Sequence, residues 1–161
     1  MKMRLVISLL LILLYPFGVI AETLTGKVVR IVDGDTLVLL DATQTQHRIR
    51  LSGIDAPEAK QPFGQKSKEN LSHLVAGKEV EVDWNKRDRY QRIVGKIIFD
   101  GQDVNLAQVR SGLSWWYRKY AREQSPVDRQ LYEAAENQAQ AEQVGIWADP
   151  NPVPPWDWRK R

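Results

Sequence analysis

The chain has 161 residues, with 23 basic and 20 acidic residues and no cysteine. A chain without cysteine has no disulfides, no thiolate metal site and no cysteine nucleophile. If residues 1–21 are removed, the loss of Lys2 and Arg4 leaves 21 basic residues against 20 acidic ones. This near balance argues against a generally basic nucleic-acid binder, and the remaining length suits one domain.

The first 21 residues have the pattern of a secretory signal peptide. A basic start precedes an apolar stretch, and the small residues Val19 and Ala21 suit positions −3 and −1 of a cleavage site. The alternative is an uncleaved membrane anchor, but Pro16 interrupts the stretch and no basic flank follows it. We therefore predict export to the periplasm or the medium, with no membrane anchor after cleavage.

The following segments predict an α+β fold with a mainly β core. Alternating or β-branched composition indicates strands at residues 23–32, 36–40, 45–51, 78–84 and 93–99. Composition and end signals indicate helices at residues 63–75, 104–110 and 125–145, with Asp103 and Ser125 as N-cap candidates. This order is consistent with strands curled into a small five-stranded barrel.

The C-terminal residues 149–161 contain four prolines, two tryptophans and three basic residues. Proline disrupts helices and sheet ladders, so we expect an extended tail, with Trp156 or Trp158 as candidates to dock it. The predicted organisation is a signal peptide at residues 1–21, a domain at residues 22–148 and a tail at residues 149–161.

The stretch Asp33-Gly34-Asp35-Thr36 lies between two apolar runs. Taken alone it predicts a hairpin turn, because glycine adopts positive φ without strain. The alternative is that the second carboxylate, that of Asp35, also takes part in chemistry.

A second pair of acids, Asp55 and Glu58, lies in the loop IDAPE, where Pro57 stiffens the backbone between them. Two aspartate carboxylates, with backbone carbonyls and waters, would suit a hard cation such as Ca²⁺. Zinc is not indicated, because His47 and His73 are the only histidines and neither lies in a metal-binding motif.

Arginines flank this loop in the sequence. Arg48 and Arg50 precede it, and Arg87, Arg89 and Arg92 lie in the segment KRDRYQR. A guanidinium matches phosphate with a rigid fork of donors, and it can stabilise the charge of a phosphoryl transition state. A single arginine in such a segment more often belongs to a solvated charged surface.

Five stretches together resemble the staphylococcal (micrococcal) nuclease family, whose domain is thermonuclease-like. They are IVDGDTLVLL, RIRLSGIDAPE, DRYQRIVGKI, GQDVNLAQVRSGLSWWY and VGIW, which occur in the family's order over residues 23–147. DGDT alone is a weak signal, whereas DGDT followed by R-x-x-x-x-D-x-P-E and Y-x-R is strong. The resemblance implies an OB-fold-like five-stranded β-barrel with about three helices.

The resemblance also implies calcium-dependent hydrolysis of DNA and RNA that leaves 3′-phosphate ends. The calcium ligands that it implies are Asp35, Asp55 and the backbone carbonyl of Ala56. The catalytic residues that it implies are Arg50, Glu58 and Arg92. The best-known member of the family has threonine where this chain has Ala56, so a carbonyl role survives here and a hydroxyl role does not.

Aromatic residues are the candidates for contact with bases. Tyr90 matches the tyrosine of the family's nucleotide pocket, and Trp115, Trp116, Tyr117 and Tyr120 align less well. Stacking is tolerant of sequence, so we expect a nonspecific nuclease that favours single-stranded or frayed substrates. We also expect a monomer. The tryptophans could instead serve only in packing.

Two other functions compete with the nuclease. One is a noncatalytic nucleic-acid-binding module on the same fold. Such a module would be expected to lack some of the acids or arginines, all of which are present here. The other is an envelope or membrane-surface interaction protein that uses the tail, although this would leave the acids and arginines unexplained.

Overall fold

A computed structural model describes residues 22–161. The predicted signal peptide, residues 1–21, lies outside the described residues. Five strands form the barrel: β1 (Glu22–Asp33), β2 (Thr36–Asp41), β3 (Gln46–Leu51), β5 (Glu79–Arg87) and β6 (Ile93–Phe99). Strand β7 (Gln102–Asp103) pairs antiparallel with β6, and β4 (Ile54–Asp55) pairs with β8 (Trp115–Trp116) in a separate two-stranded sheet.

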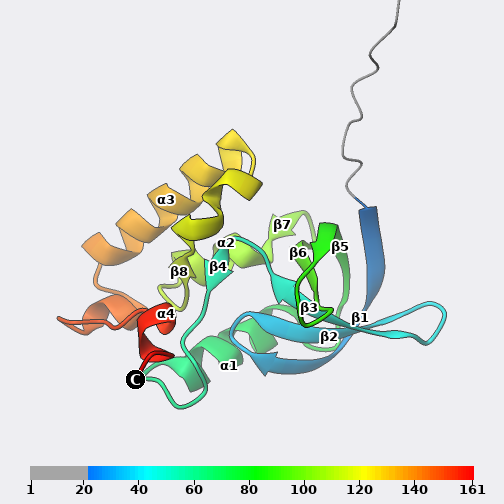
Figure 1. Ribbon diagram of the computed structural model, residues 1–161, viewed down its shortest axis with the longest axis horizontal. Coiled ribbons are helices and arrows are strands. Elements are labelled where there is room, and N and C mark those ends of the chain that lie inside the picture. Colours follow the sequence, from blue (N-terminus) through cyan, green and yellow to red (C-terminus); the bar gives the residue numbers. More distant parts are fainter. Residues whose placement is uncertain (1–21) are drawn as a thin grey trace, which may run out of the picture.

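Antiparallel pairing in the order β3-β2-β1-β5-β6 is closed by a parallel pairing of β3 with β6 (Figure 1). Register shifts in β1 and in the β5–β6 pair bend these long strands, as closure of a small barrel requires. The α+β fold with an OB-like five-stranded barrel is therefore confirmed. Strand β5 runs on to Arg87, beyond the predicted end at residue 84, because the following residues continue the alternation of the strand.

Side chains from the inward face of the strands fill the interior of the barrel. Leu37, Leu39, Ile49, Val82 and Ile97 are fully buried, as expected for alternate positions along strands. Helix α1 (Gly64–Val75) packs against β1, and α2 (Val104–Arg110) lies between the barrel and α3 (Pro126–Ala141) (Figure 1).

The helix ends agree in part with the predicted signals. Asp103 caps α2 by accepting from the Leu106 N–H at 2.9 Å, and Ser125 caps α3 by accepting from Asp128 N–H at 3.0 Å. Helix α3 ends at Ala141, four residues before Gly145, since a turn with Gln143 at φ 51° intervenes.

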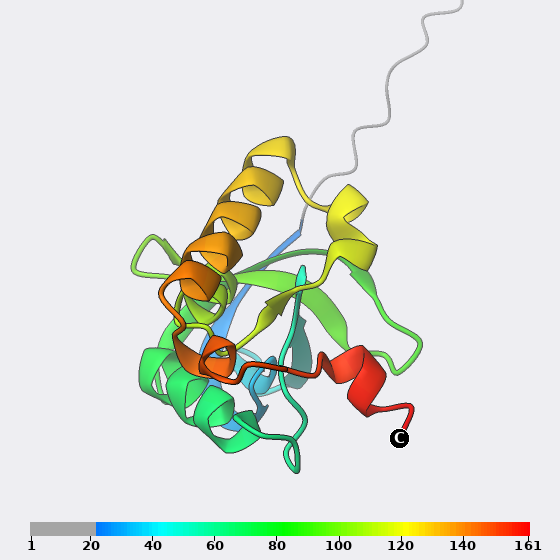
Figure 2. The same ribbon diagram turned by 90° about the vertical axis from the view of Figure 1, so that its left-hand side faces the viewer.

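Short helical segments complete the fold. These are η1 (Arg118–Glu123), η2 (Gly145–Ala148) and α4 (Pro155–Trp158). The tail is not extended throughout, because Pro155 occupies the first turn of α4, where proline fits a helix. It crosses the face formed by β4, β8 and the loop after β4 (Figure 2). Among residues 22–161 there is no helix with the length and apolar character to cross a membrane.

Candidate active site

The turn between β1 and β2 presents Asp35. The Asp33 carboxylate accepts from the Asp35 N–H at 3.1 Å, which closes the turn as the sequence predicts. Gly34, however, does not have positive φ. A Cβ at Gly34 would lie 1.9 Å from Ser67 Oγ on α1, so glycine is needed here for close approach. The buried Gln108 of α2 donates to the Gly34 carbonyl at 2.6 Å, and this bond ties the turn to α2.

The Asp35 carboxylate is 6% exposed and is held on both oxygens. Its Oδ1 accepts from Thr36 Oγ1 at 3.1 Å, and its Oδ2 accepts from the Ala56 N–H at 2.6 Å. The second bond joins the β1–β2 turn to the loop after β4. The two acidic stretches of the sequence therefore meet in space.

Arg50, near the end of β3, joins the two aspartates. Its Nη1 lies 3.1 Å from Asp35 Oδ2 and its Nη2 lies 3.0 Å from Asp55 Oδ1. Nη1 also donates to the Leu51 carbonyl at 3.0 Å, which orients the guanidinium. Asp55 is 1% exposed, because β4 and its partner β8 enclose it. One arginine thus faces two nearly buried carboxylates.

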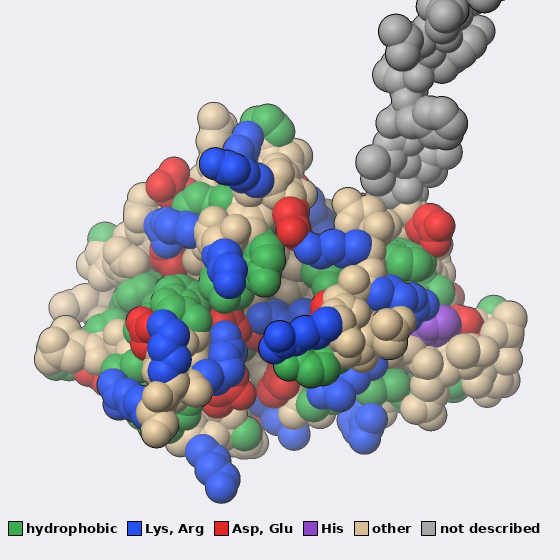
Figure 3. Space-filling view, viewed as in Figure 1, with side chains coloured by type: hydrophobic (Ala, Val, Ile, Leu, Met, Phe, Trp, Pro, Cys, Tyr) green, Lys and Arg blue, Asp and Glu red, His purple; other side chains and the backbone are tan. Residues whose placement is uncertain are grey.

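Glu58 completes the acidic group and is far more accessible, with 41% of its side chain exposed. Its backbone N–H donates to Gln61 Oε1 at 3.1 Å, which orders the loop. An exposed carboxylate beside two buried ones can reach a substrate or a water. In Figure 3 acidic and basic side chains adjoin near the centre of the face that carries the tail.

Arg159 in the tail is a site residue that sequence reasoning missed. It donates from Nη2 to Asp55 Oδ2 at 2.6 Å and from Nη1 to Glu58 Oε1 at 2.6 Å. The basic end of the tail was visible in the sequence, but its partners lie about 100 residues earlier. No local pattern predicts a contact over that separation.

Burial perturbs the acids. It raises the pKa of the Asp55 carboxyl above its usual value, although hydrogen bonds from Arg159 and the charge of Arg50 act in the opposite direction. Burial, and then the charge of Asp35, raises the pKa of Asp33 to about 6. Hydrogen bonds to Asp55 raise the pKa of Arg159. The negative charge of Asp35 therefore disfavours ionisation of Asp55 and Asp33. A cation bound beside these carboxylates would stabilise their ionised forms.

The donor atoms suit a hard cation. Asp35 and Asp55 both place carboxylate oxygens against the guanidinium of Arg50, and the backbone N–H of Ala56 bonds to Asp35. Oxygen ligands without sulfur or imidazole fit Ca²⁺ or Mg²⁺. Among residues 22–161 no three His, Cys, Asp or Glu side chains form a metal cluster. A cation would thus depend on two aspartates, with backbone carbonyls and waters as further ligands.

Arg92 lies apart from these contacts. It precedes β6, which runs beside β3, and its Nε donates to Asp88 Oδ2 at 2.7 Å. Its guanidinium carbon is 5.6 Å from the ring centre of Tyr90, which is 63% exposed. The catalytic role of Arg92 and the base-binding role of Tyr90 stay predictions, with Tyr90 free to meet a ligand.

Trp116 in β8 and the residue after it, Tyr117, differ in their surroundings. Trp116 is 6% exposed, with its N–H bonded to Glu136 and its ring nitrogen to Gln124, which fits the packing alternative. Tyr117 is half-buried, and its ring stacks on Trp156 of the tail with centres 5.1 Å apart. Of the two, Tyr117 is the better placed to contact a base.

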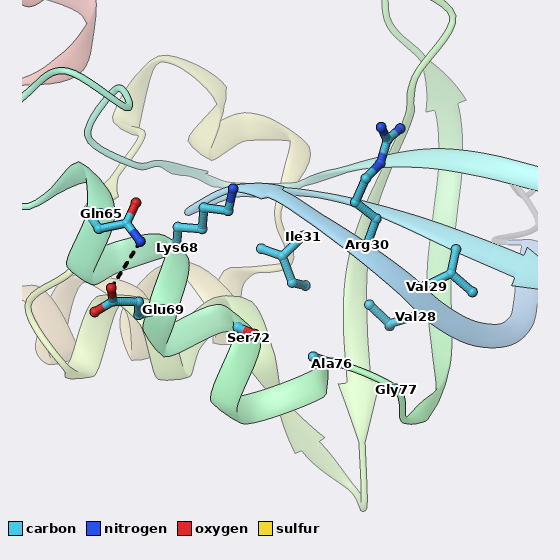
Figure 4. A pocket seen from close by; sticks show the side chains of 10 residues that line it. All are labelled: Val28, Val29, Arg30, Ile31, Gln65, Lys68, Glu69, Ser72, Ala76 and Gly77. Carbon is cyan, nitrogen blue, oxygen red and sulfur yellow. Dashed lines mark hydrogen bonds between the residues drawn. The ribbon is translucent and has the colours of Figure 1, made fainter.

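Two surface hollows lie near α1. One, of about 340 Å³, is lined by residues of β1 and α1 that include Arg30 and Lys68 (Figure 4). The other, of about 630 Å³, lies beside the start of α1 and is bordered by Trp158. Neither is lined by Asp35, Asp55 or Glu58, so neither is the candidate site.

Comparison with known proteins identifies the class. Residues 48–149 match the family model described as staphylococcal nuclease homologue. An uncharacterised endonuclease of Escherichia coli is 42% identical over 153 residues, which cover 94% of this chain and 95% of that protein. A protein named micrococcal nuclease from Shigella flexneri is 40% identical over 144 residues, covering 84% and 80% of the two chains.

The fold, the acids and these relatives define a phosphodiester hydrolase of the nuclease class. The chain belongs to the staphylococcal nuclease family, which confirms the resemblance predicted from its motifs. Nucleases of this family act on nucleic acids and are generally metal-dependent.

Proposed function

We propose that the protein is an exported, calcium-dependent endonuclease that hydrolyses DNA and RNA with little sequence preference and leaves 3′-phosphate ends. The observation that carries the proposal is the contact of Arg50 with both Asp35 and Asp55, at 3.1 and 3.0 Å. Two buried carboxylates held on one guanidinium, with an exposed glutamate beside them, form an arrangement suited to phosphoryl chemistry.

Asp35, Asp55 and the carbonyl of Ala56 would hold the cation. When bound, Ca²⁺ would supply positive charge to a phosphate oxygen and lower the pKa of a water. Arg50 is already oriented by the Leu51 carbonyl, and it can donate to a phosphate oxygen without rearranging its backbone. Its charge would then stabilise the negative charge that develops on the phosphate oxygens during in-line attack.

Glu58 would orient or deprotonate the attacking water. Its side chain is 41% exposed, whereas Asp35 and Asp55 are nearly buried, so it is the carboxylate with access to solvent. Cleavage of the P–O5′ bond would leave a 3′-phosphate and a 5′-hydroxyl. Arg92 would add a second donor to the phosphate once its bond to Asp88 is exchanged for the substrate.

Exposed aromatic residues would bind bases without reading their sequence. The Tyr90 ring is 63% exposed and lies under the guanidinium of Arg89 at 4.7 Å, which favours contact with an anionic strand. Unpaired bases are free to stack on such a ring, so we propose a preference for single-stranded or frayed DNA and RNA. We also propose that the protein acts as a monomer. The Arg89 and Arg92 side chains beside it would attract the backbone.

Export is proposed from the sequence of residues 1–21. The chain would reach the periplasm or the medium and would lose its apolar leader on the way. Mass measurement of the protein recovered from the envelope or medium would show whether cleavage follows Ala21. A mass that retains residues 1–21 would contradict the proposal.

The nuclease activity is tested with residues 22–161 on denatured DNA and on RNA, in Ca²⁺ and in excess chelator. The comparison includes Glu58→Gln and, as a matched control, Glu133→Gln on the exposed side of α3. We expect cleavage by wild type and Glu133→Gln in Ca²⁺ alone, with loss of at least a hundredfold in Glu58→Gln. Equal rates for the two variants would contradict the role of Glu58.

A further inference from the structure

The C-terminal tail is anchored beside the candidate site. Gln61 donates to the Val153 carbonyl at 2.5 Å, and Pro155 is buried. Trp156 stacks on Tyr117 with an interplanar angle of 2°, and its edge contacts Trp115 at 6.4 Å between ring centres. The position of the tail is therefore set by packing as well as by charge.

From this anchor, Arg159 reaches the acids that the proposed reaction needs. Its two terminal nitrogens lie 2.6 Å from Asp55 Oδ2 and 2.6 Å from Glu58 Oε1, and Nη1 lies 3.3 Å from Asp55 Oδ1. Together with Arg50, the tail arginine engages both oxygens of Asp55. A guanidinium fork is a strong partner for carboxylates in this geometry.

We propose that the tail is a removable plug of the active site, in which Arg159 competes with the divalent cation for Asp55 and at the same time engages Glu58, the proposed base. The proposal rests on the proposed function, since it takes Asp55 as a ligand of the cation. The closed tail and the bound cation then exclude one another. The protein has a closed state with Arg159 on the acids and an open, metal-binding state.

Charge explains why a cation can replace the arginine. Three carboxylates, those of Asp35, Asp55 and Glu58, face the two guanidinium groups of Arg50 and Arg159. A divalent cation in place of Arg159 would bring two positive charges to the three carboxylates where the arginine brings one. The arginine itself is 44% exposed and lies near the end of the chain, so it can move into solvent.

The same tail covers an aromatic surface. Trp156 stacks on the ring of Tyr117, which is the better placed of Trp116 and Tyr117 to contact a base. A strand that stacks on Tyr117 would therefore have to displace Trp156, which would also withdraw Arg159. Metal and substrate would each favour the open tail, so each would strengthen binding of the other.

The size of the effect follows from the population of the closed state. Apparent metal affinity is reduced by the fraction of molecules that are open. If the tail is closed in about nine molecules of ten, removal of Arg159 raises the affinity for Ca²⁺ about tenfold. If Arg159 instead bound the substrate phosphate, its removal would leave the affinity for Ca²⁺ unchanged. Its removal would then slow cleavage even at saturating Ca²⁺.

The test is Ca²⁺ binding by titration calorimetry, without substrate, on residues 22–161. Wild type is compared with Arg159→Gln and with Lys160→Gln, a control that removes the same charge from the neighbouring position. We expect about tenfold tighter binding in Arg159→Gln and wild-type affinity in Lys160→Gln. Trp156→Ala keeps every charge but loosens the anchor, so it should also bind Ca²⁺ more tightly.

Cleavage rates provide a second readout. Arg159→Gln should be faster than wild type at limiting Ca²⁺ and equal to it at saturating Ca²⁺. The plug is overturned if Arg159→Gln binds Ca²⁺ no more tightly than Lys160→Gln, or if it is slow at saturating Ca²⁺; in either case the proposed nuclease site stands. If Ca²⁺ binds to none of the proteins, the metal assignment fails and the plug fails with it.

Discussion

Replacement of Arg50 by methionine tests how the two buried aspartates are held. Methionine keeps most of the apolar stem and removes the guanidinium that lies 3.1 Å from Asp35 and 3.0 Å from Asp55. Both carboxylates then lose their shared cation, while Asp55 keeps its contact with Arg159. In the absence of metal we expect the variant to fold with lower stability.

The magnitude follows from burial. Removal of one partner of a buried ion pair costs about 3–5 kcal/mol, because a charge is left uncompensated. The side chain of Arg50 is 14% exposed and Arg159 remains, so we expect a cost of about 2–4 kcal/mol. For a domain of this size, this corresponds to a fall in Tm of about 10 °C.

The assay is denaturant unfolding in chelator, followed by tryptophan fluorescence, on Arg50→Met, Asp35→Asn and the double variant. If the aspartates depend on Arg50, Asp35→Asn should recover part of the stability lost in Arg50→Met, giving a coupling energy of about 1 kcal/mol or more. Additive effects of the two substitutions would refute this account of how the site is held together.

Three further predictions concern chemistry, packing and pH. Glu58→Gln should lower kcat at least a hundredfold while its Tm stays within about 2 °C of wild type, because the side chain is half exposed; an equally large fall in Tm would point to a structural role. Tyr132→Phe loses the hydrogen bonds from the hydroxyl to Asp103, at 2.9 and 3.1 Å. Denaturant titration should show a loss of about 1–3 kcal/mol with cleavage intact, and wild-type stability would argue against those bonds. Hydrogen bonds, the largest from His47, hold the pKa of Asp41 below its ordinary value. Its contribution to stability is therefore complete above about pH 4 and is lost as the pH falls further. The Tm difference between wild type and Asp41→Ala should shrink below that pH, and a difference that grows there would contradict the assignment.

The barrel strands and main helices could be predicted because their signals are local. Residues 36–40 and 93–99 have the apolar, β-branched composition of buried strands, and Asp103 and Ser125 are caps that act within three residues. The structure places Arg50 against Asp35 and Asp55, with Glu58 linked to Asp55 through Arg159, whereas Arg92 bonds to Asp88. The roles that the motifs imply for these residues stay predictions.

Other features depend on contacts between distant segments. The pairing of β4 with β8 spans two residues on each strand, too few for any periodicity to be recognised. The need for Gly34 is set by Ser67 on α1, and only a three-dimensional structure reveals that close approach. Arg159 reaches Asp55 across 104 positions of the sequence, so no motif near either residue could indicate the contact.

Asp35 and Asp55 are proposed to form the metal-dependent centre of a nuclease. The most direct measurement is the rate at which residues 22–161 cleave denatured DNA in Ca²⁺ and in excess chelator, for wild type and for Asp55→Asn. We predict cleavage only by wild type and only in Ca²⁺. Undiminished cleavage in chelator, or by Asp55→Asn, would contradict the claim.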